Sequence, residues 1–398
     1  MSTEGKTLGV LRPLLLAALV SAISACSSVP SGDAAAPAVA APLKAGELPR
    51  LPEKAINIED RWSVSVGNGA GGEALSLEPA VQAPAIYVAS RNGVVKSIGR
   101  ASGTERWEIK LTDGVTGGVA VDDDLLIVGT DQSDLLAINN KNGKPVWRAP
   151  LGSALLSTPR INAKVVVVQT LDGRVQVFER TTGKRRWQFD TPVPPLSLRG
   201  NAAPVISNDK LYAVSGQGDL YQLDLATGLP IWQTRVTNSR GRGEIERLMD
   251  IDGDLVLDSN GTLYTAGFQS QLTATDTQQV RRRWQLNVST TQSVGVDNAQ
   301  VYAVDVDGTL AAVNRITGAL VWKQESLKGR KLLAPVIWRG LVVVGDSEGY
   351  LHIFSPVDGA VRGRERAARD PLMSVMVDAP QLLTLTVDGT LRAWDMKL

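Results

Sequence analysis

Tryptophan recurs along this chain at a nearly constant interval. It stands at positions 62, 107, 147, 187, 232, 284 and 322, with gaps of 45, 40, 40, 45, 52 and 38 residues. The later tryptophans end a common phrase, as in ASGTERW, KNGKPVW and TTGKRRW. A period of about 40–45 residues is that of one β-propeller blade. The repeat therefore predicts a ring of similar units.

Each repeat also predicts four short strands. About ten residues before each phrase lies a second turn that contains glycine, which takes positive φ without steric cost. These turns are Asn92-Gly93, Asp172-Gly173, Gln217-Gly218, Asp307-Gly308, Glu348-Gly349 and Asp388-Gly389. Period-2 runs such as RVQVFE (174–179) lie between the turns and are typical of strands. The sequence thus predicts an all-β fold of four-stranded antiparallel blades.

The two ends of the repeat region complement each other. The last copy, TLTVDGTLRAWDMKL, stops before its Trp strand, whereas the first Trp strand, RWSVSVG (61–67), has no blade before it. We expect the N-terminal strand to complete the last blade, which leaves no open sheet edge. Seven internal blades and one composite blade make eight.

The recurring tryptophans are interpreted as core residues between neighbouring blades. One indole buries about 150–250 Å², which contributes several kcal/mol at about 25 cal/mol per Å². Two copies depart from the pattern: Gly363 stands where a Trp is expected, and the turn at Thr277-Gln278 lacks its glycine. Both departures concern the packing of blades.

The first 25 residues are interpreted as a secretory signal peptide. Lys6 and Arg12 precede an apolar run, Leu14 to Ile23, which is too short to span a bilayer of about 30 Å. The run ends in Ile23-Ser24-Ala25-Cys26, which resembles a bacterial lipobox, a signal cleaved before a cysteine that is then lipidated. An ordinary signal peptide with an incidental cysteine is the alternative.

The domain organisation follows from these boundaries. Residues 1–25 are the expected signal peptide, 26–52 the lipidated Cys26 with a flexible tether rich in Ala and Pro, and 53–398 the propeller. Ser27 follows the cysteine in place of the aspartate of inner-membrane retention signals, so we expect an outer-membrane lipoprotein that faces the periplasm.

Composition excludes several classes of function. The chain has 42 Lys and Arg against 41 Asp and Glu, and a net charge of +1 is too small to attract nucleic acid. One cysteine and one histidine, His352, exclude a disulfide framework and a Cys/His zinc cluster. We therefore expect no metal, no cofactor and no catalytic residue.

Two motifs are interpreted as structural. Gly67 to Gly72 (GNGAGG) matches GxGxxG, but the following EALSLEPAV indicates a loop that leads into a strand, whereas a dinucleotide site needs a helix. The segment Asp250 to Asp254 (DIDGD) resembles a calcium loop, but Leu255 stands where the EF-hand turn requires glycine.

Two connections between blades are longer than the others. Trp187 to Pro204 spans 17 residues and Trp232 to Leu255 about 23, against 12 or 13 elsewhere. They leave consecutive blades, so they should be neighbours on one rim, where binding residues often lie on a rigid scaffold. The first carries PLSLRG (195–200) and the second acidic residues. This is the composition of a protein interface, although burial of the leucines under their own loop is an equal alternative.

Taken together, these features resemble the BamB family, lipoprotein subunits of the β-barrel assembly machinery of Gram-negative outer membranes. The lipobox, the tether, the eight Trp repeats of quinoprotein type, PLSLRG and ERLMDID (246–252) carry the resemblance. In that family the two loops contact the periplasmic POTRA domains of BamA. By motif, the resemblance implies that five residues bind this partner: Leu196, Leu198, Arg199, Asp250 and Asp252.

The resemblance implies a non-catalytic scaffold in the Bam complex that aids folding and insertion of unfolded outer membrane β-barrel proteins. A periplasmic quinone-dependent dehydrogenase is the alternative, because it shares the propeller and the Trp motif. Such enzymes need a central cofactor site and often paired cysteines, whereas this chain has only Cys26. A general periplasmic adaptor with another partner is the third possibility.

Overall fold

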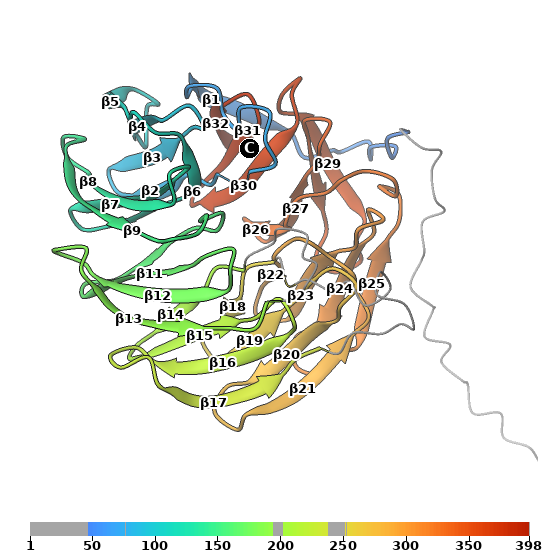
Figure 1. Cartoon of the computed structure of the whole chain (residues 1–398). Coiled ribbons are helices and arrows are strands. Elements are labelled where there is room, and N and C mark those ends of the chain that lie inside the picture. The colour runs from blue at the N-terminus through green and yellow to red at the C-terminus, as the bar shows by residue number, and fades with distance from the viewer. Residues whose placement is uncertain (1–46, 76, 194–201, 238–250, 252, 398) are drawn as a thin grey trace, which may run out of the picture. The chain divides into compact units, whose positions relative to one another are not determined.

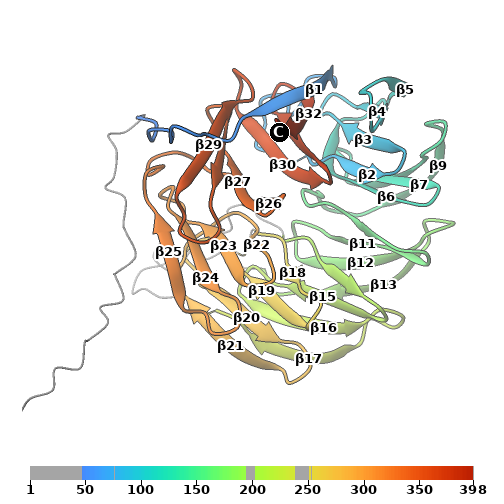
Figure 2. The ribbon, with the colours of Figure 1, turned by 180° about the vertical axis from the view of Figure 1, so that it is seen from behind.

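Eight four-stranded antiparallel sheets follow one another around a ring in chain order (Figure 1). The computed structural model describes residues 47–75, 77–193, 202–237, 251 and 253–397, which contain strands and turns but no helix. The first strand of each blade lies nearest the middle of the ring, and the fourth lies at the circumference (Figures 1 and 2). The predicted eight-bladed propeller is confirmed.

The blades are numbered from the first complete one. Blade 1 is β2 (Ala80–Gln82), β3 (Ala85–Ala89), β4 (Val94–Gly99) and β5 (Glu105–Lys110); blade 2 is β6 (Val115–Asp122), β7 (Leu125–Thr130), β8 (Asp134–Asn139) and β9 (Pro145–Pro150); blade 3 is β10 (Arg160–Ile161), β11 (Val165–Gln169), β12 (Arg174–Glu179) and β13 (Arg185–Asp190); blade 4 is β14 (Val205–Ser207), β15 (Lys210–Val214), β16 (Asp219–Asp224) and β17 (Pro230–Arg235).

The second half repeats the arrangement. Blade 5 is β18 (Val256–Leu257), β19 (Thr262–Thr265), β20 (Leu272–Asp276) and β21 (Arg281–Leu286); blade 6 is β22 (Gly295–Val296), β23 (Gln300–Val304), β24 (Leu310–Asn314) and β25 (Leu320–Gln324); blade 7 is β26 (Val336–Trp338), β27 (Leu341–Gly345), β28 (Tyr350–Phe354) and β29 (Val361–Arg366); blade 8 is β30 (Leu372–Asp378), β31 (Gln381–Thr386), β32 (Thr390–Met396) and β1 (Ile58–Ser65).

Blade 8 closes the ring with strands from both ends of the chain, as predicted. β1 pairs antiparallel with β32 from Ile58 opposite Met396 to Ser65 opposite Thr390, with one irregularity near Asp60. In Figure 1 the blue β1 lies beside the red β32. The pairing covers the edge that β32 would otherwise expose.

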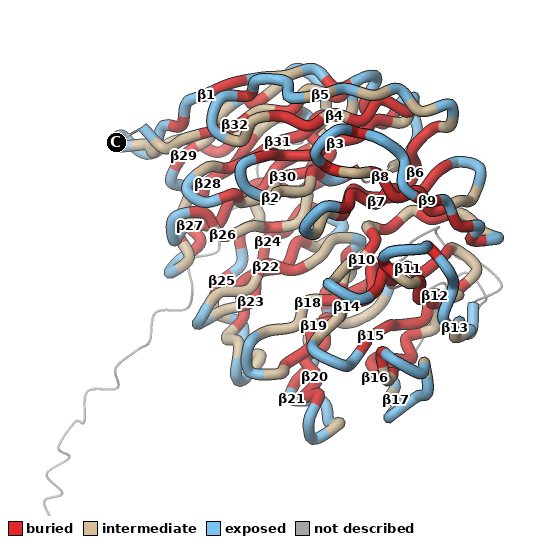
Figure 3. Tube along the Cα trace, turned by 90° about the vertical axis from the view of Figure 1, so that its left-hand side faces the viewer, coloured by how far each residue is buried: buried red, intermediate tan, exposed pale blue. Residues whose placement is uncertain are grey.

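The repeated glycine and tryptophan form one contact between neighbouring blades. A Cβ added to Gly103 would lie 2.7 Å from the Trp62 ring of the preceding blade, and one on Gly318 would lie 2.6 Å from Trp284. The indole N–H also crosses the interface: Trp322 donates to Pro356 O at 2.7 Å. Because a side chain would collide with the ring in these blades, the position favours glycine. Figure 3 shows that burial follows the strands, while the turns stay exposed.

Val280 occupies this glycine position in blade 5. Its φ is +52°, a left-handed conformation that is strained for a β-branched residue. We expect Val280→Gly to stabilise the protein by about 1 kcal/mol, because relief of about 1–3 kcal/mol of strain exceeds the entropic cost of glycine. Urea unfolding measures the change. Val321→Gly, in β25 at an ordinary strand φ, is the control and should destabilise; equal losses for both variants would contradict the strain at Val280.

Gly363 lacks a side chain because the N-terminal segment crosses it. A Cβ at Gly363 would collide with the Ile56 carbonyl oxygen, and the Ile56 N–H donates to Arg362 O at 2.7 Å. A different tryptophan bonds across the same pair of blades: the buried Trp338 of β26 donates to Pro380 O, in the turn between β30 and β31 of blade 8, at 2.8 Å. The departure from the repeat thus marks the place where the N-terminal segment packs on blade 7.

Candidate partner-binding rim

The antiparallel order of the blades gives the ring two different rims. The connections between blades and the turns between second and third strands share one rim, here called the connection rim. The turns between first and second strands and between third and fourth strands share the other, here called the hairpin rim. The connection rim is tightly built, since a Cβ on Gly173 would lie 2.6 Å from Val193 and 2.8 Å from Thr191 O.

The two connections predicted to bind a partner both lie on the connection rim. They comprise residues 191–204, between β13 and β14, and 236–255, between β17 and β18. The five predicted contact residues, Leu196, Leu198, Arg199, Asp250 and Asp252, lie outside the described residues, as does Cys26. Their roles therefore stay predictions, and the structure describes only the ends of the two loops.

Asp254 ties the ends of both connections together. Its Oδ1 accepts the Ala203 N–H at 2.8 Å, and its Oδ2 accepts Arg160 Nη2 of β10 at 2.7 Å. Arg160 Nε donates to Pro204 O at 3.1 Å. The loop that ends at Pro204 is thereby fixed to the loop that ends at Leu255. Sequence reasoning missed Arg160, for which no signal existed, and considered Asp254 only as part of a calcium-like segment.

An apolar cluster supports the same junction. Ala202 from the first connection and Ile251 and Leu255 from the second are buried together with Tyr212 and Leu263 of blades 4 and 5. The bases of the two loops therefore share one core, which holds them next to each other on the rim.

The expectation that these are the two longest connections needs a correction. The connection from β1 to β2, residues 66–79, holds 14 residues, as many as 191–204, while 236–255 holds 20. The other five hold between 4 and 11. The estimate from Trp spacing left this connection out because blade 8 is split between the two ends of the chain.

The 66–79 connection seals the joint between blades 8 and 1. Val66 N–H donates to Gly389 O at 2.8 Å, Ala70 N–H to Val387 O at 2.9 Å, and Arg91 N–H to Gly69 O at 2.6 Å. Gly69 has a φ of +57°, and a Cβ there would collide with the backbone of Val387 and Gly389. The glycines of GNGAGG therefore serve close backbone packing, and the segment leads into strand β2, as predicted.

Glu78 faces the Arg160–Asp254 pair from the start of blade 1. Its side chain is open to solvent but surrounded by protein at longer range, and this surrounding raises its pKa to about 7. The negative charge of Asp254 raises the pKa further, and Arg160 opposes the shift. An acid with a raised pKa holds its proton longer in the folded state than in the unfolded state.

This shift predicts a pH dependence of stability. The ordinary pKa of Glu78 is 4.5, so its contribution is complete below that pH and is lost as pH rises toward about 7. We expect Glu78→Gln to flatten the stability profile over this window, measured by urea unfolding at several pH values. Glu73→Gln, an exposed acid of the same connection, should leave the slope unchanged. A slope that persists in Glu78→Gln would contradict the assignment.

The only histidine belongs to a buried ionic cluster in blade 7. His352 Nε2 contacts Asp346 Oδ2 at 2.9 Å, Arg330 Nε donates to the same oxygen at 2.8 Å, and all three side chains are almost inaccessible. Burial lowers the pKa of His352, although Asp346 opposes this. The pKa of Asp346 falls to about 2, since its hydrogen bonds, to His352 foremost, outweigh the effect of burial. This arrangement is structural.

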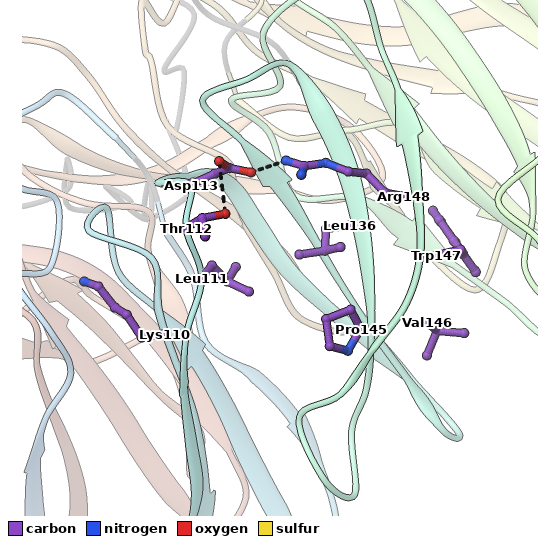
Figure 4. Close-up of a pocket in the computed structure, with 9 residues that line it drawn as sticks. All are labelled: Lys110, Leu111, Thr112, Asp113, Leu136, Pro145, Val146, Trp147 and Arg148. Carbon is purple, nitrogen blue, oxygen red and sulfur yellow. Dashed lines mark hydrogen bonds and ion pairs between the residues drawn. The ribbon is translucent and has the colours of Figure 1, made fainter.

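A groove of about 420 Å³ opens at the circumference between blades 1 and 2 (Figure 4). Leu111, Leu136 and Val146 are among its apolar residues, and Arg148 of β9 forms an ion pair with Asp113 across it. Its charged residues are Lys110, Asp113 and Arg148, and it lacks histidine, cysteine and serine. The lining offers apolar contact, a salt bridge and the Thr112 hydroxyl, which donates to Asp113 Oδ1 at 3.3 Å.

Within the described ranges, no group of three or more His, Cys, Asp or Glu is placed to hold a metal ion. Among the same residues there is no helix of the length and hydropathy needed to cross a membrane.

Comparison with known proteins finds similarity along most of the chain. The family profile described as outer membrane protein assembly factor BamB matches residues 91–324 and 289–397. The protein of that name from Yersinia pestis is 30% identical over 398 residues, covering 96% of this chain and 99% of its own. The one from Pseudomonas aeruginosa is 37% identical over 355 residues, covering 89% and 90%.

Solved structures give the same result. The crystal structure of BamB from Moraxella catarrhalis superposes with a TM-score of 0.78 at 29% identity, covering 85% of this chain and all of that one. A europium-containing methanol dehydrogenase superposes with a TM-score of 0.67 at 11% identity, which is a likeness of fold alone.

Proposed function

Since the chain belongs to the BamB family of outer membrane protein assembly factors, we propose that it is a scaffold subunit of the Bam complex that binds the POTRA domains of BamA through its connection rim. In this role it aids the folding and insertion of β-barrel outer membrane proteins. It carries out no chemical reaction; it holds its partner in position.

The junction built on Asp254 is the observation that carries the proposal. It fixes the ends of two consecutive long connections to each other and to β10. Loops with joined bases present their outer residues as one surface, and a rigid base reduces the entropy lost on binding. Apolar Leu196 and Leu198 beside Arg199, next to the acids Asp250 and Asp252, have the composition of an interface hot spot.

Anchoring through Cys26 completes the proposal. A lipidated Cys26 would hold the propeller at the periplasmic face of the outer membrane, and multiple acyl chains make such anchoring stable. Residues 27–46 then act as the tether between lipid and ring.

The enzyme alternative has less support. A quinohemoprotein alcohol dehydrogenase and a europium-containing methanol dehydrogenase share the fold at 12% and 11% identity, whereas assembly factors share 30–37% identity over most of the chain. An alcohol oxidation assay with added quinone and calcium should show no turnover, and robust turnover would overturn the scaffold proposal.

Copurification with BamA tests the interface. We expect Leu196→Ala/Leu198→Ala and Arg199→Glu each to reduce capture of BamA at least tenfold, because truncating a hot-spot residue costs about 2 kcal/mol or more. A matched control truncates Leu229 and Ile231 and reverses Arg186, which are exposed on the hairpin rim. The control should capture BamA normally. Full capture by the loop variants, with the fold intact, would place the BamA site elsewhere.

A further inference from the structure

Among the residues that the structure describes, most exposed large aliphatic side chains lie on the hairpin rim. Of the eight described, six lie at a turn between third and fourth strands or at the start of the fourth strand: Val146, Leu229, Ile231, Ile316, Leu320 and Val357. Ile316 is 73% exposed and Leu229 is 66% exposed. Side chains exposed to this extent add little to the core, and their concentration on one rim favours a binding surface there.

Basic residues lie in three of the five turns of blades 2 to 6, and acidic residues are missing from all five. The turns of blades 2 to 6 and the first residues of their fourth strands (141–146, 181–186, 226–231, 277–283 and 316–320) contain eight Lys or Arg and no Asp or Glu. The eight are Lys141, Lys144, Lys184, Arg185, Arg186, Arg281, Arg282 and Arg283, and all are exposed. These five turns are here called the basic arc. The whole chain is nearly neutral, so the arc reflects a separation of charge within the ring.

Few of these cations are neutralised by neighbours. Arg283 pairs with Asp276 at 2.8 Å, and Arg186 approaches Glu179 only to 3.9 Å. Arg281 and Arg282 form no ion pair with the described residues. The hairpin rim also carries acids at the turns between first and second strands, nearer the middle of the ring, where Asp122 and Asp124 pair with Arg180. The outer edge of this rim therefore keeps its positive charge.

The N-terminal segment joins the ring on the same rim. Asn57 precedes β1 and lies beside the end of β32, since Lys397 N–H donates to Asn57 O at 3.0 Å. Upstream, Pro49 is buried on blade 7, where its carbonyl oxygen accepts Arg364 Nη1 at 2.9 Å. Twenty residues, 27–46, separate Cys26 from the first residue that the structure describes. The described N-terminal segment thus passes over blade 7 and enters β1 at the hairpin rim.

We propose that the basic arc docks on the anionic phospholipid surface of the membrane to which the chain is tethered. This inference rests on the lipid anchor proposed above. Lys and Arg would meet the lipid phosphates, and Leu229, Ile231, Ile316 and Leu320 would enter the headgroup layer, as basic amphipathic surfaces do. The connection rim would then point away from the bilayer with its partner-binding loops free.

A bilayer fits this surface better than a protein does. The basic and apolar side chains are spread over five blades on one edge of a ring, and a plane can contact all of them at once. Each basic residue near an anionic bilayer strengthens binding of the protein about fivefold. A bilayer also needs no matching pattern of acidic residues.

The test uses the full-length lipoprotein in vesicles. The thiol of a lipidated Cys26 is blocked, so Thr317→Cys on the arc, or Gln132→Cys on the connection rim, gives one reactive thiol for an environment-sensitive dye. We expect a blue shift at Thr317→Cys on vesicles of phosphatidylethanolamine with phosphatidylglycerol, none on phosphatidylcholine, and none at Gln132→Cys. High salt should reverse the shift, because salt screens exposed charges.

Charge variants decide between docking and chance proximity. Arg281→Glu/Arg282→Glu should lower the ratio of docked to undocked protein at least about 25-fold, at about fivefold for each cation. Lys331→Glu/Arg369→Glu removes equal charge on the connection rim and should dock normally. If the dye at Thr317→Cys shows no blue shift on anionic vesicles, or shifts only when BamA is added, the basic arc does not dock on lipid. Flotation of the protein with vesicles tests the anchor separately, and capture of BamA by the arc variant tests the proposed function.

Discussion

Deletion of residues 47–65 should leave a chain that fails to form a stable monomeric propeller. The deletion removes β1, which pairs with β32 over seven positions and brings Trp62 into the interface with blade 1. Burial of one indole contributes about 4–6 kcal/mol, and the net stability of a domain is about 5–15 kcal/mol. Loss of the strand also exposes the β32 edge, which promotes aggregation. Size-exclusion chromatography and circular dichroism measure both effects.

A matched deletion and a peptide separate strand loss from shortening. Deleting 27–46, which removes the tether but keeps β1, should leave the melting temperature unchanged. A synthetic peptide of residues 47–65, added in trans, should restore part of the fold. The milder Trp62→Ala should cost about 3–5 kcal/mol. If the 47–65 deletion melted like the tether deletion as a monomer, closure by β1 would not stabilise the ring.

The second large effect is expected at Asp346. Asp346→Ala should destabilise the protein by about 3–5 kcal/mol, because it leaves the buried Arg330 without its main anionic partner. Asp346 also accepts the backbone N–H groups of Glu348 and Tyr350 at 2.9 Å, so the turn before β28 loses its cap. For a ring of this size the loss corresponds to a melting temperature about 5 °C lower.

The dependence of stability on acidic pH tests the role of Asp346 independently. The pKa of Asp346 is lowered from 3.8 to about 2, so its contribution is complete above pH 3.8 and is lost as pH falls toward 2. The stability of Asp346→Ala should not show this loss between pH 3.8 and about 2. Asp370→Ala, an exposed acid of the same rim, should change stability by no more than about 0.5 kcal/mol. Equal effects of the two variants would show that burial of Asp346 is unimportant.

Most of the fold was predictable because a repeat states the same local information several times. The interval between tryptophans set the blade, the glycine turns set the hairpins, and the incomplete copies at the two ends predicted their union in blade 8. Period-2 runs identify strands without knowledge of distant contacts, because each strand alternates its faces on its own.

The exceptions to the repeat were not predictable in their consequences. The sequence does not explain Gly363, which is required by the Ile56 carbonyl that lies over it, and it gives no sign that Trp338 bonds across to blade 8. The sequence shows that the turn after Asp276 lacks its glycine, but only the φ of Val280 reveals the strain there. Such features depend on segments far apart in the chain, whose approach local patterns do not encode.

By itself the sequence determined the number of blades, the closing strand and the two connections in which a partner site was sought. The tertiary structure alone decided that Asp254 joins the bases of those connections, that residues 66–79 seal the ring, and that exposed cations and aliphatics collect on one rim. The physical reason is that strand propensity and turn chemistry act between near neighbours. Ion pairs, blade contacts and surface patches arise only once distant turns are brought to the same face.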